Sequence, residues 1–193
     1  MKKAILFLDA QNIKRGARNS LKVIVDFTRL RKLIREQCEV NGYTLVLVKY
    51  YEGLYPAWVK TQDDPGIKRL GLVLDTVKKE VTFLRKQGFE VVTKELRYER
   101  DKHSKRGVFF QKGIDVQMAL DMIRAFKDIG CELFIVGSGD EDFIPAIDLL
   151  KEEGAVVWIA AVGSNISSRM VRMADRFIRL DGYKHRIKAL PRQ

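Results

Sequence analysis

Residues 135–145, with the sequence IVGSGDEDFIP, constrain the fold of this chain most strongly. An apolar run predicts a buried strand, Gly-Ser-Gly predicts a tight turn, and Pro145 is tolerated only in the first turn of a helix, which therefore begins near Asp142. Asp140 and Asp142 then lie at the carboxyl end of a strand, where open α/β sheets bind ligands. One acid could serve only as a helix cap, but three consecutive acids exceed what capping needs.

The rest of the chain alternates strands with helices, which predicts a three-layer, doubly wound and mainly parallel α/β sheet. Residues 4–8 form a continuous apolar run that fits a strand buried on both faces, and Asp9 ends it. We expect further strands at 44–51, 89–96, 132–136, 155–162 and 176–180, and helices at 26–40, 70–87, 113–127, 142–154 and 164–174. The strand at 89–96 should lie near a sheet edge, because its flanks are charged.

The connecting segments are predicted less sharply. Residues 10–24 are expected to form a polar, basic loop, 52–66 an irregular segment, and 97–112 a basic stretch with a hairpin arm around 108–110. Residues 1–183 are expected to form one domain, and 184–193 a basic tail, with fraying from Asp181 onward.

Composition limits the classes of function. The 193 residues carry 36 Lys and Arg against 25 Asp and Glu, a formal charge of +11, which indicates a polyanionic partner or else a generally basic protein. No apolar run approaches the ~20 residues of a membrane span, and Asp9 interrupts the run after Lys2 and Lys3, so we expect a cytoplasmic protein that does not enter membranes. Two cysteines without metal-ligand spacing and only two histidines argue against a zinc site or a Ser-His-Asp triad.

Carboxylates follow two of the predicted strands, since Asp9 ends the first and Asp140 and Asp142 follow the fourth. If those strands are neighbours, the three acids meet at one sheet edge. Asp115 lies in the first turn of the helix at 113–127, at the margin of its apolar face, and Asp121 is expected on the solvated side. The predicted apolar face consists of Val116, Ala119, Leu120, Ile123 and Phe126. Four gathered carboxylates would each have a raised pKa or would need a cation, and oxygen-only ligands select Mg²⁺ or Mn²⁺.

Four segments together resemble the NYN domain family, a branch of the PIN-like nucleases: 7–13 (FLDAQNI), 112–116 (KGIDV), 137–143 (GSGDEDF) and 173–178 (MADRFI). The family usually has Asp-Gly-Asn or Asp-x-Asn in its first motif, whereas this chain has one residue more between Asp9 and Asn12. The resemblance implies a PIN-like (Rossmann-like) fold and a metal-dependent ribonuclease. It makes Asp9, Asp115, Asp140 and Asp142 the metal-binding and catalytic acids, with Asn12 and Ser138 as supporting polar groups.

The hypothesis is hydrolysis of RNA by water activated at this aspartate cluster, leaving 5′-phosphate and 3′-hydroxyl ends. The first alternative is a non-catalytic, RNA-binding regulatory module on the same fold. The second, a phosphatase or nucleotide-processing enzyme, is less favoured because Gln11 replaces the second acid of an Asp-x-Asp pair and no Walker loop is present.

Basic residues near the expected site are the candidates for contact with RNA, whether single-stranded or structured. They are Lys14, Arg15, Arg18, Arg97, Arg100, Lys102, Lys105, Arg106 and Lys112. Tyr98, Phe109 and Phe110 are interleaved with the later members, as in single-strand binders, although we expect the two phenylalanines to pack inward. A third basic group, Arg169, Arg172, Arg176 and Arg179, is open between an RNA surface and the interface of a homodimer.

Overall fold

The computed structural model describes residues 2–100 and 107–190, and its centre is a six-stranded sheet in the order β3-β2-β1-β6-β7-β8. All pairs of neighbouring strands in this sheet are parallel. The strands are β1 (Lys2–Asp9), β2 (Tyr43–Leu54), β3 (Glu90–Glu95), β6 (Leu133–Gly137), β7 (Val156–Ala161) and β8 (Arg176–Arg179). Residues Ala4 to Leu8 of β1 have no exposed surface, as expected for a central parallel strand.

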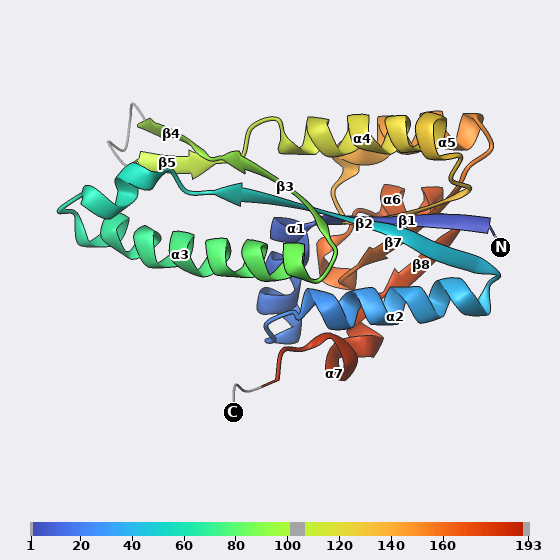
Figure 1. The fold of residues 1–193 in the computed structure, drawn as a ribbon, viewed down its shortest axis with the longest axis horizontal. Coiled ribbons are helices and arrows are strands. Elements are labelled where there is room, and N and C mark those ends of the chain that lie inside the picture. Colours follow the sequence, from blue (N-terminus) through green and yellow to red (C-terminus); the bar gives the residue numbers. More distant parts are fainter. Residues whose placement is uncertain (1, 101–106, 191–193) are drawn as a thin grey trace.

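Helices cover both faces of the sheet, so the predicted three-layer α/β fold is confirmed (Figure 1). One face carries α1 (Ala10–Gly16), α2 (Phe27–Val40), α3 (Pro65–Lys86) and α7 (Lys184–Ile187), and the other carries α4 (Ile114–Ile129), α5 (Ile144–Glu152) and α6 (Ser168–Met173). Two apolar clusters fill the spaces between the layers. No helix in the described ranges is long and apolar enough to span a membrane.

An antiparallel hairpin, β4 (Arg97–Arg100) and β5 (Gly107–Phe110), forms the predicted arm. It lies beyond the carboxyl end of β2, beside the 3-10 turn Ala57–Thr61, at the end of the molecule opposite the N-terminus (Figure 1). The predicted edge position of β3 is confirmed, because β3 pairs only with β2.

The prediction of a loop at residues 10–24 is wrong. Helix α1 begins directly after Asp9 and continues into a π-helical turn, Ala17–Leu21. Ala10, Ile13, Ala17 and Leu21 are buried and recur every three to four residues, so they form an apolar helical stripe. The many basic residues between them hid this periodicity.

The prediction that the chain frays after Asp181 is also wrong for the described residues. A 3-10 turn, Leu180–Tyr183, leads into α7, and Ile187 is completely buried. The Ile187 carbonyl accepts a hydrogen bond of 2.8 Å from the backbone N–H of Asp26, at the start of α2. The basic segment from residue 184 is therefore packed against α2, where Arg29 also donates hydrogen bonds to the carbonyls of His185 and Arg186.

Candidate active site

Asp9 lies at the carboxyl end of β1 and caps the N-terminus of α1. Its Oδ1 accepts a hydrogen bond of 3.0 Å from the backbone N–H of Asn12, and its Oδ2 accepts one of 3.1 Å from the Ser138 hydroxyl. Strands β1 and β6 are neighbours, with Leu8 opposite Gly137, so the two acid-bearing strand ends meet as expected. Asn12, three residues after the cap, is thereby held beside the site despite the longer first motif.

A buried network holds the turn after β6. The Asn12 side-chain oxygen accepts hydrogen bonds from the Gly139 backbone N–H (3.0 Å) and from Asn165 Nδ2 (2.9 Å). The Ser138 hydroxyl accepts one of 3.2 Å from the Asp140 backbone N–H while it donates to Asp9. Asn165 was not predicted, although its position just after the carboxyl end of β7 was a usable signal.

Gly139 is required at this turn by close packing. A Cβ atom at this position would lie far inside van der Waals contact of the Asn165 carbonyl oxygen and 2.7 Å from the Ile166 Cα. Both are backbone atoms, which cannot move aside as a side chain could.

We expect Gly139→Ala to lower the free energy of unfolding by about 2–4 kcal/mol and to displace the Asn12–Asn165 network. Urea unfolding tests this, with Gly182→Ala as the control, because a Cβ at Gly182 meets nothing within 4 Å; equal losses would contradict the packing argument.

The other three predicted acids lie at the same sheet edge, since the charges of Asp115 and Asp140 act on Asp9 and the charge of Asp142 acts on Asp115. Asp115 is half-buried in the first turn of α4, where its Oδ1 accepts a hydrogen bond of 3.2 Å from Gln111 Nε2. Asp140 and Asp142 are exposed, and Asp140 Oδ1 accepts a hydrogen bond of 3.1 Å from the Asp142 backbone N–H. Burial and then the charges of Asp140 and Asp142 raise the pKa of Asp115. The four acids therefore influence one another at a single sheet edge.

Asp9 is the acid most affected by its surroundings. Burial raises the pKa of Asp9 from 3.8 to about 6, with contributions in the same direction from the charges of Asp115 and Asp140. The hydrogen bonds from Asn12 and Ser138 act in the opposite direction and favour the ionised form. Ionisation of Asp9 is thus unfavourable in the metal-free protein, and a cation bound at this edge would stabilise the negative charge.

This raised pKa predicts how stability depends on pH. Because the folded protein holds the Asp9 proton more tightly than the unfolded chain, ionisation of Asp9 destabilises the metal-free fold as the pH rises from about 4 to 6. In EDTA, Asp9→Asn should therefore be more stable than the wild type by about 2–3 kcal/mol at pH 7.5. The difference should vanish near pH 4. Thermal unfolding at both pH values tests this, and a variant that is less stable at pH 7.5 would contradict it.

The acids fit Mg²⁺ or Mn²⁺ better than an ion that needs a closed cage. Within residues 2–100 and 107–190, no three His, Cys, Asp or Glu side chains converge closely enough to enclose a cation. Mg²⁺ keeps several waters and uses only one or two carboxylates directly, so more distant acids can act through water. An oxygen-only donor set around one buried carboxylate suits this kind of binding.

The predicted RNA-binding residues lie in different environments. Arg15, Arg18, Arg97 and Lys112 are exposed, as a contact with RNA requires. Lys14 instead pairs at 2.5 Å with both Glu52 and Glu80, which argues against its predicted role. Lys102, Lys105 and Arg106 lie outside the described residues, as does the side chain of Arg100. In the third basic group, Arg176 packs on the Trp158 ring and donates to Gln37, whereas Arg169, Arg172 and Arg179 are exposed.

The prediction that Asp121 is solvated is wrong. Asp121 is 7% exposed and accepts hydrogen bonds from the Tyr51 hydroxyl (2.8 Å) and from Gln117 Nε2 (2.9 Å). The buried face of α4 is formed by Ile114, Met118, Met122 and Ala125, while Val116 and Leu120 are exposed. The predicted apolar face of this helix was rotated from the real one because Asp121 was assigned to the polar surface, whereas it accepts a hydrogen bond from the buried Tyr51 of β2.

Comparisons with known proteins agree with this architecture. The sequence model of the NYN domain matches residues 3–181. A protein of unknown function, VPA0982 from Vibrio parahaemolyticus RIMD 2210633, has a solved structure with a TM-score of 0.69 and 22% identity, covering 97% of this chain and 96% of that one, which shows a shared fold. MurG of Acinetobacter baumannii reaches a TM-score of only 0.41 at 11% identity, over 92% of this chain and 41% of that one, and supports no argument. No curated protein gives a significant match. The match over residues 3–181 covers nearly the whole sequence, and this chain belongs to the NYN domain family.

Proposed function

We propose that this chain is a metal-dependent ribonuclease that hydrolyses RNA phosphodiester bonds at the edge formed by Asp9, Asp115, Asp140 and Asp142. The observation that carries the proposal is the buried Asp9 carboxylate, which is held by two hydrogen bonds while its pKa is raised to about 6. Active sites are where burial and like charges shift pKa values, so a perturbed acid at the carboxyl end of a parallel strand supports a functional site. The NYN family is generally nuclease-like, which supports the same reading.

The chain's own residues provide binding and orientation. Asp9 and Asp140 are the acids that would hold Mg²⁺ or Mn²⁺, with Asp115 and Asp142 adding negative charge beside them. When bound, the ion supplies a more acidic water and offsets the charge of the phosphate. Ser138 orients the Asp9 carboxylate, and the Asn12–Asn165 pair holds the Gly139 backbone, so the acids keep their positions during the reaction.

Exposed cations near the acids would hold the RNA backbone. Arg15 and Arg18 follow Asp9 on α1 and its π-helical turn, and Lys112 precedes Asp115. These residues would place the phosphate against the acidic edge by charge attraction. Attack by water in place of the 2′-hydroxyl gives products with 5′-phosphate and 3′-hydroxyl ends.

A non-catalytic RNA-binding module is the second candidate, and it is favoured by the finding that no three acidic, His or Cys side chains within residues 2–100 and 107–190 converge closely enough to enclose a cation. A cleavage assay separates the two. Single-stranded and structured RNA are incubated with Mg²⁺, with Mn²⁺ or with EDTA, beside an Asp140→Asn variant. The nuclease predicts metal-dependent cutting that the variant lacks, whereas tight binding without cutting in either metal supports the RNA-binding module.

A further inference from the structure

Four aromatic rings, two on the hairpin arm and two from the segment after β2, form a cluster that belongs to neither apolar core. We call Tyr55, Trp58, Tyr98 and Phe109 the arm cluster. Phe109 lies at its centre, with ring centroids 4.9 Å from Tyr98, 5.1 Å from Tyr55 and 5.6 Å from Trp58. Trp58 and Tyr98 meet edge to face at 5.3 Å. Phe109 was expected to pack in the core, but it is only half-buried. Its contacts are with the other three rings of this cluster.

The arm cluster presents a preorganised surface. The Trp58 side chain stands at its outer side, with 37% of the residue exposed. The Tyr98 ring lies directly over Gly107 on the opposite strand, where any larger residue would displace it, so the ring is held flat against the hairpin. Trp58 and Tyr98 also line an open hollow of about 660 Å³. Flat, fixed aromatic faces beside a hollow are suited to stacking against another ring.

The charged residues that line the hollow favour a neutral nucleobase over a phosphate as its occupant. Glu95 and Glu99 line it together with Arg97, so an anion placed inside would meet two carboxylates. A neutral base avoids this repulsion, and its amino groups can donate to the acids. Arg97 nevertheless lines the hollow too, and Lys94 and Lys112 are exposed in the described parts of the same stretch, which suits the phosphates on either side.

The arm cluster lies close to the acidic edge along the chain. Phe109, at the centre of the arm cluster, lies on β5, and Asp115 follows six residues later in the first turn of α4. Because an extended chain covers at most ~3.6 Å per residue, the Cα atoms of Phe109 and Asp115 are within about 22 Å of each other. A nucleic acid bound at the acids therefore needs only a few nucleotides to reach the rings.

We propose that the arm cluster is a stacking site for unpaired bases of an RNA strand whose scissile phosphate lies at the acidic edge. The inference deepens the proposed function and rests on it for the identity of the ligand. Bases inside a duplex have no free faces for Trp58 or Tyr98, so the site selects single-stranded RNA or a single-stranded flank. Interleaved cations favour RNA over a second protein copy as the occupant, because a copy of this chain carries the same +11 charge.

Tryptophan fluorescence reports on this site directly. The chain has two tryptophans, and Trp158 is 4% exposed and covered by Arg176 and Tyr43. Stacking on Trp58 should therefore quench the exposed part of the emission. The titration uses a short single-stranded oligoribonucleotide in EDTA, where binding is measured without cleavage, beside a duplex of the same sequence. We expect quenching by the single strand and little by the duplex.

Two substitutions of Trp58 then test whether the base stacks on this residue. Trp58→Leu should weaken binding of the single strand by about tenfold, as expected for one lost stacking partner. Trp58→Phe keeps a ring, so it should bind within about threefold of the wild type while losing the quenching signal. Thermal unfolding of each variant checks that the fold is kept.

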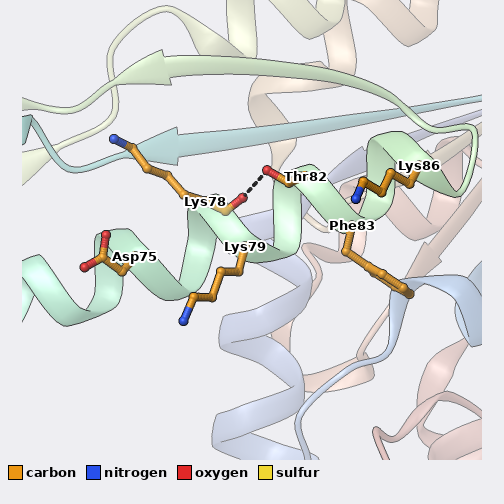
Figure 2. A pocket seen from close by; sticks show the side chains of 6 residues that line it. All are labelled: Asp75, Lys78, Lys79, Thr82, Phe83 and Lys86. Atoms are coloured by element: carbon orange, nitrogen blue, oxygen red, sulfur yellow. Dashed lines mark hydrogen bonds between the residues drawn. The ribbon is translucent and has the colours of Figure 1, made fainter.

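A second exposed aromatic provides the matched control. Figure 2 shows Phe83 on α3, near Lys79 and Lys86, and Phe83 is 51% exposed. Phe83→Ala should leave affinity unchanged. The proposal is overturned if Trp58→Leu binds the single strand as tightly as the wild type does, or if only Phe83→Ala weakens binding. It is also overturned if the wild type does not bind single strands, or if Trp58→Leu loses only self-association. Cleavage is measured separately, so quenching without cutting in any metal would keep the stacking site and reject the nuclease.

Discussion

Replacing Asp9 by asparagine should abolish RNA cleavage while the fold is kept. Asp9 is the only one of the four acids that is fully buried, and both of its oxygens accept hydrogen bonds. Asparagine keeps the shape of the side chain but cannot carry the negative charge that a divalent cation needs. We expect cleavage to fall by more than about 100-fold, which exceeds the usual effect of losing a supporting group around a metal.

The effects of the other acids should follow their positions. Asp140→Asn should match Asp9→Asn, because the Asp140 charge acts on both Asp9 and Asp115. Asp142 is exposed, and its charge acts on Asp115 less strongly than the charge of Asp140 does, so its substitution should reduce cleavage least. Initial rates of cleavage with Mn²⁺ and Mg²⁺ measure this series. Asp148→Asn, at an exposed position on α5, is the control and should cleave as the wild type does.

This experiment cannot be confused with unfolding. The raised pKa of Asp9 predicts that Asp9→Asn is more stable than the wild type at neutral pH without metal. Lost activity in a protein of higher stability would therefore point to the acid itself. Full cleavage by both Asp9→Asn and Asp140→Asn would refute the active-site assignment.

The strands and the positions of the acids at their ends were predictable because backbone rules act on short segments, whereas the adjacency of the first and fourth predicted strands was only a condition. A continuous apolar run ending in Asp9 and a strand-turn-Pro145 segment both determine where a carboxylate lies relative to the sheet. Neighbouring β1 and β6 then bring these acids together without any information about side-chain contacts. Asp115 was found in the same way, from its place in the first turn of α4.

The errors about single side chains arose where a polar group has a buried partner. Asp121 faces inward because the Tyr51 hydroxyl and Lys49 meet it, and those partners are about 70 residues away along the chain. Lys14 was counted as a free cation for the same reason, since its partners Glu52 and Glu80 come from β2 and α3. Such pairings depend on the tertiary fold, so composition and helical periodicity cannot show them.

Lys14 also gives a large expected effect on stability. Its ammonium lies 2.5 Å from a carboxylate oxygen of both Glu52 and Glu80, and Glu52 is 3% exposed. The Tyr50 hydroxyl donates a further hydrogen bond of 3.1 Å to Glu52. Lys14→Met would leave two neighbouring carboxylates without their cation, one of them buried.

We expect Lys14→Met to lower the free energy of unfolding by about 3 kcal/mol at pH 7, the lower end of the range for breaking a buried pair, because the lysine side chain is 29% exposed. Lys60→Met is the matched control, since Lys60 pairs with Asp75 at the surface and should lose less than about 1 kcal/mol. Urea unfolding of both variants measures the contrast. Adding Glu52→Gln to Lys14→Met should recover part of the loss, because it removes the unpaired buried charge. If both lysine variants lost equally little, Lys14 would be a free surface cation after all, and its predicted contact with RNA would have to be restored.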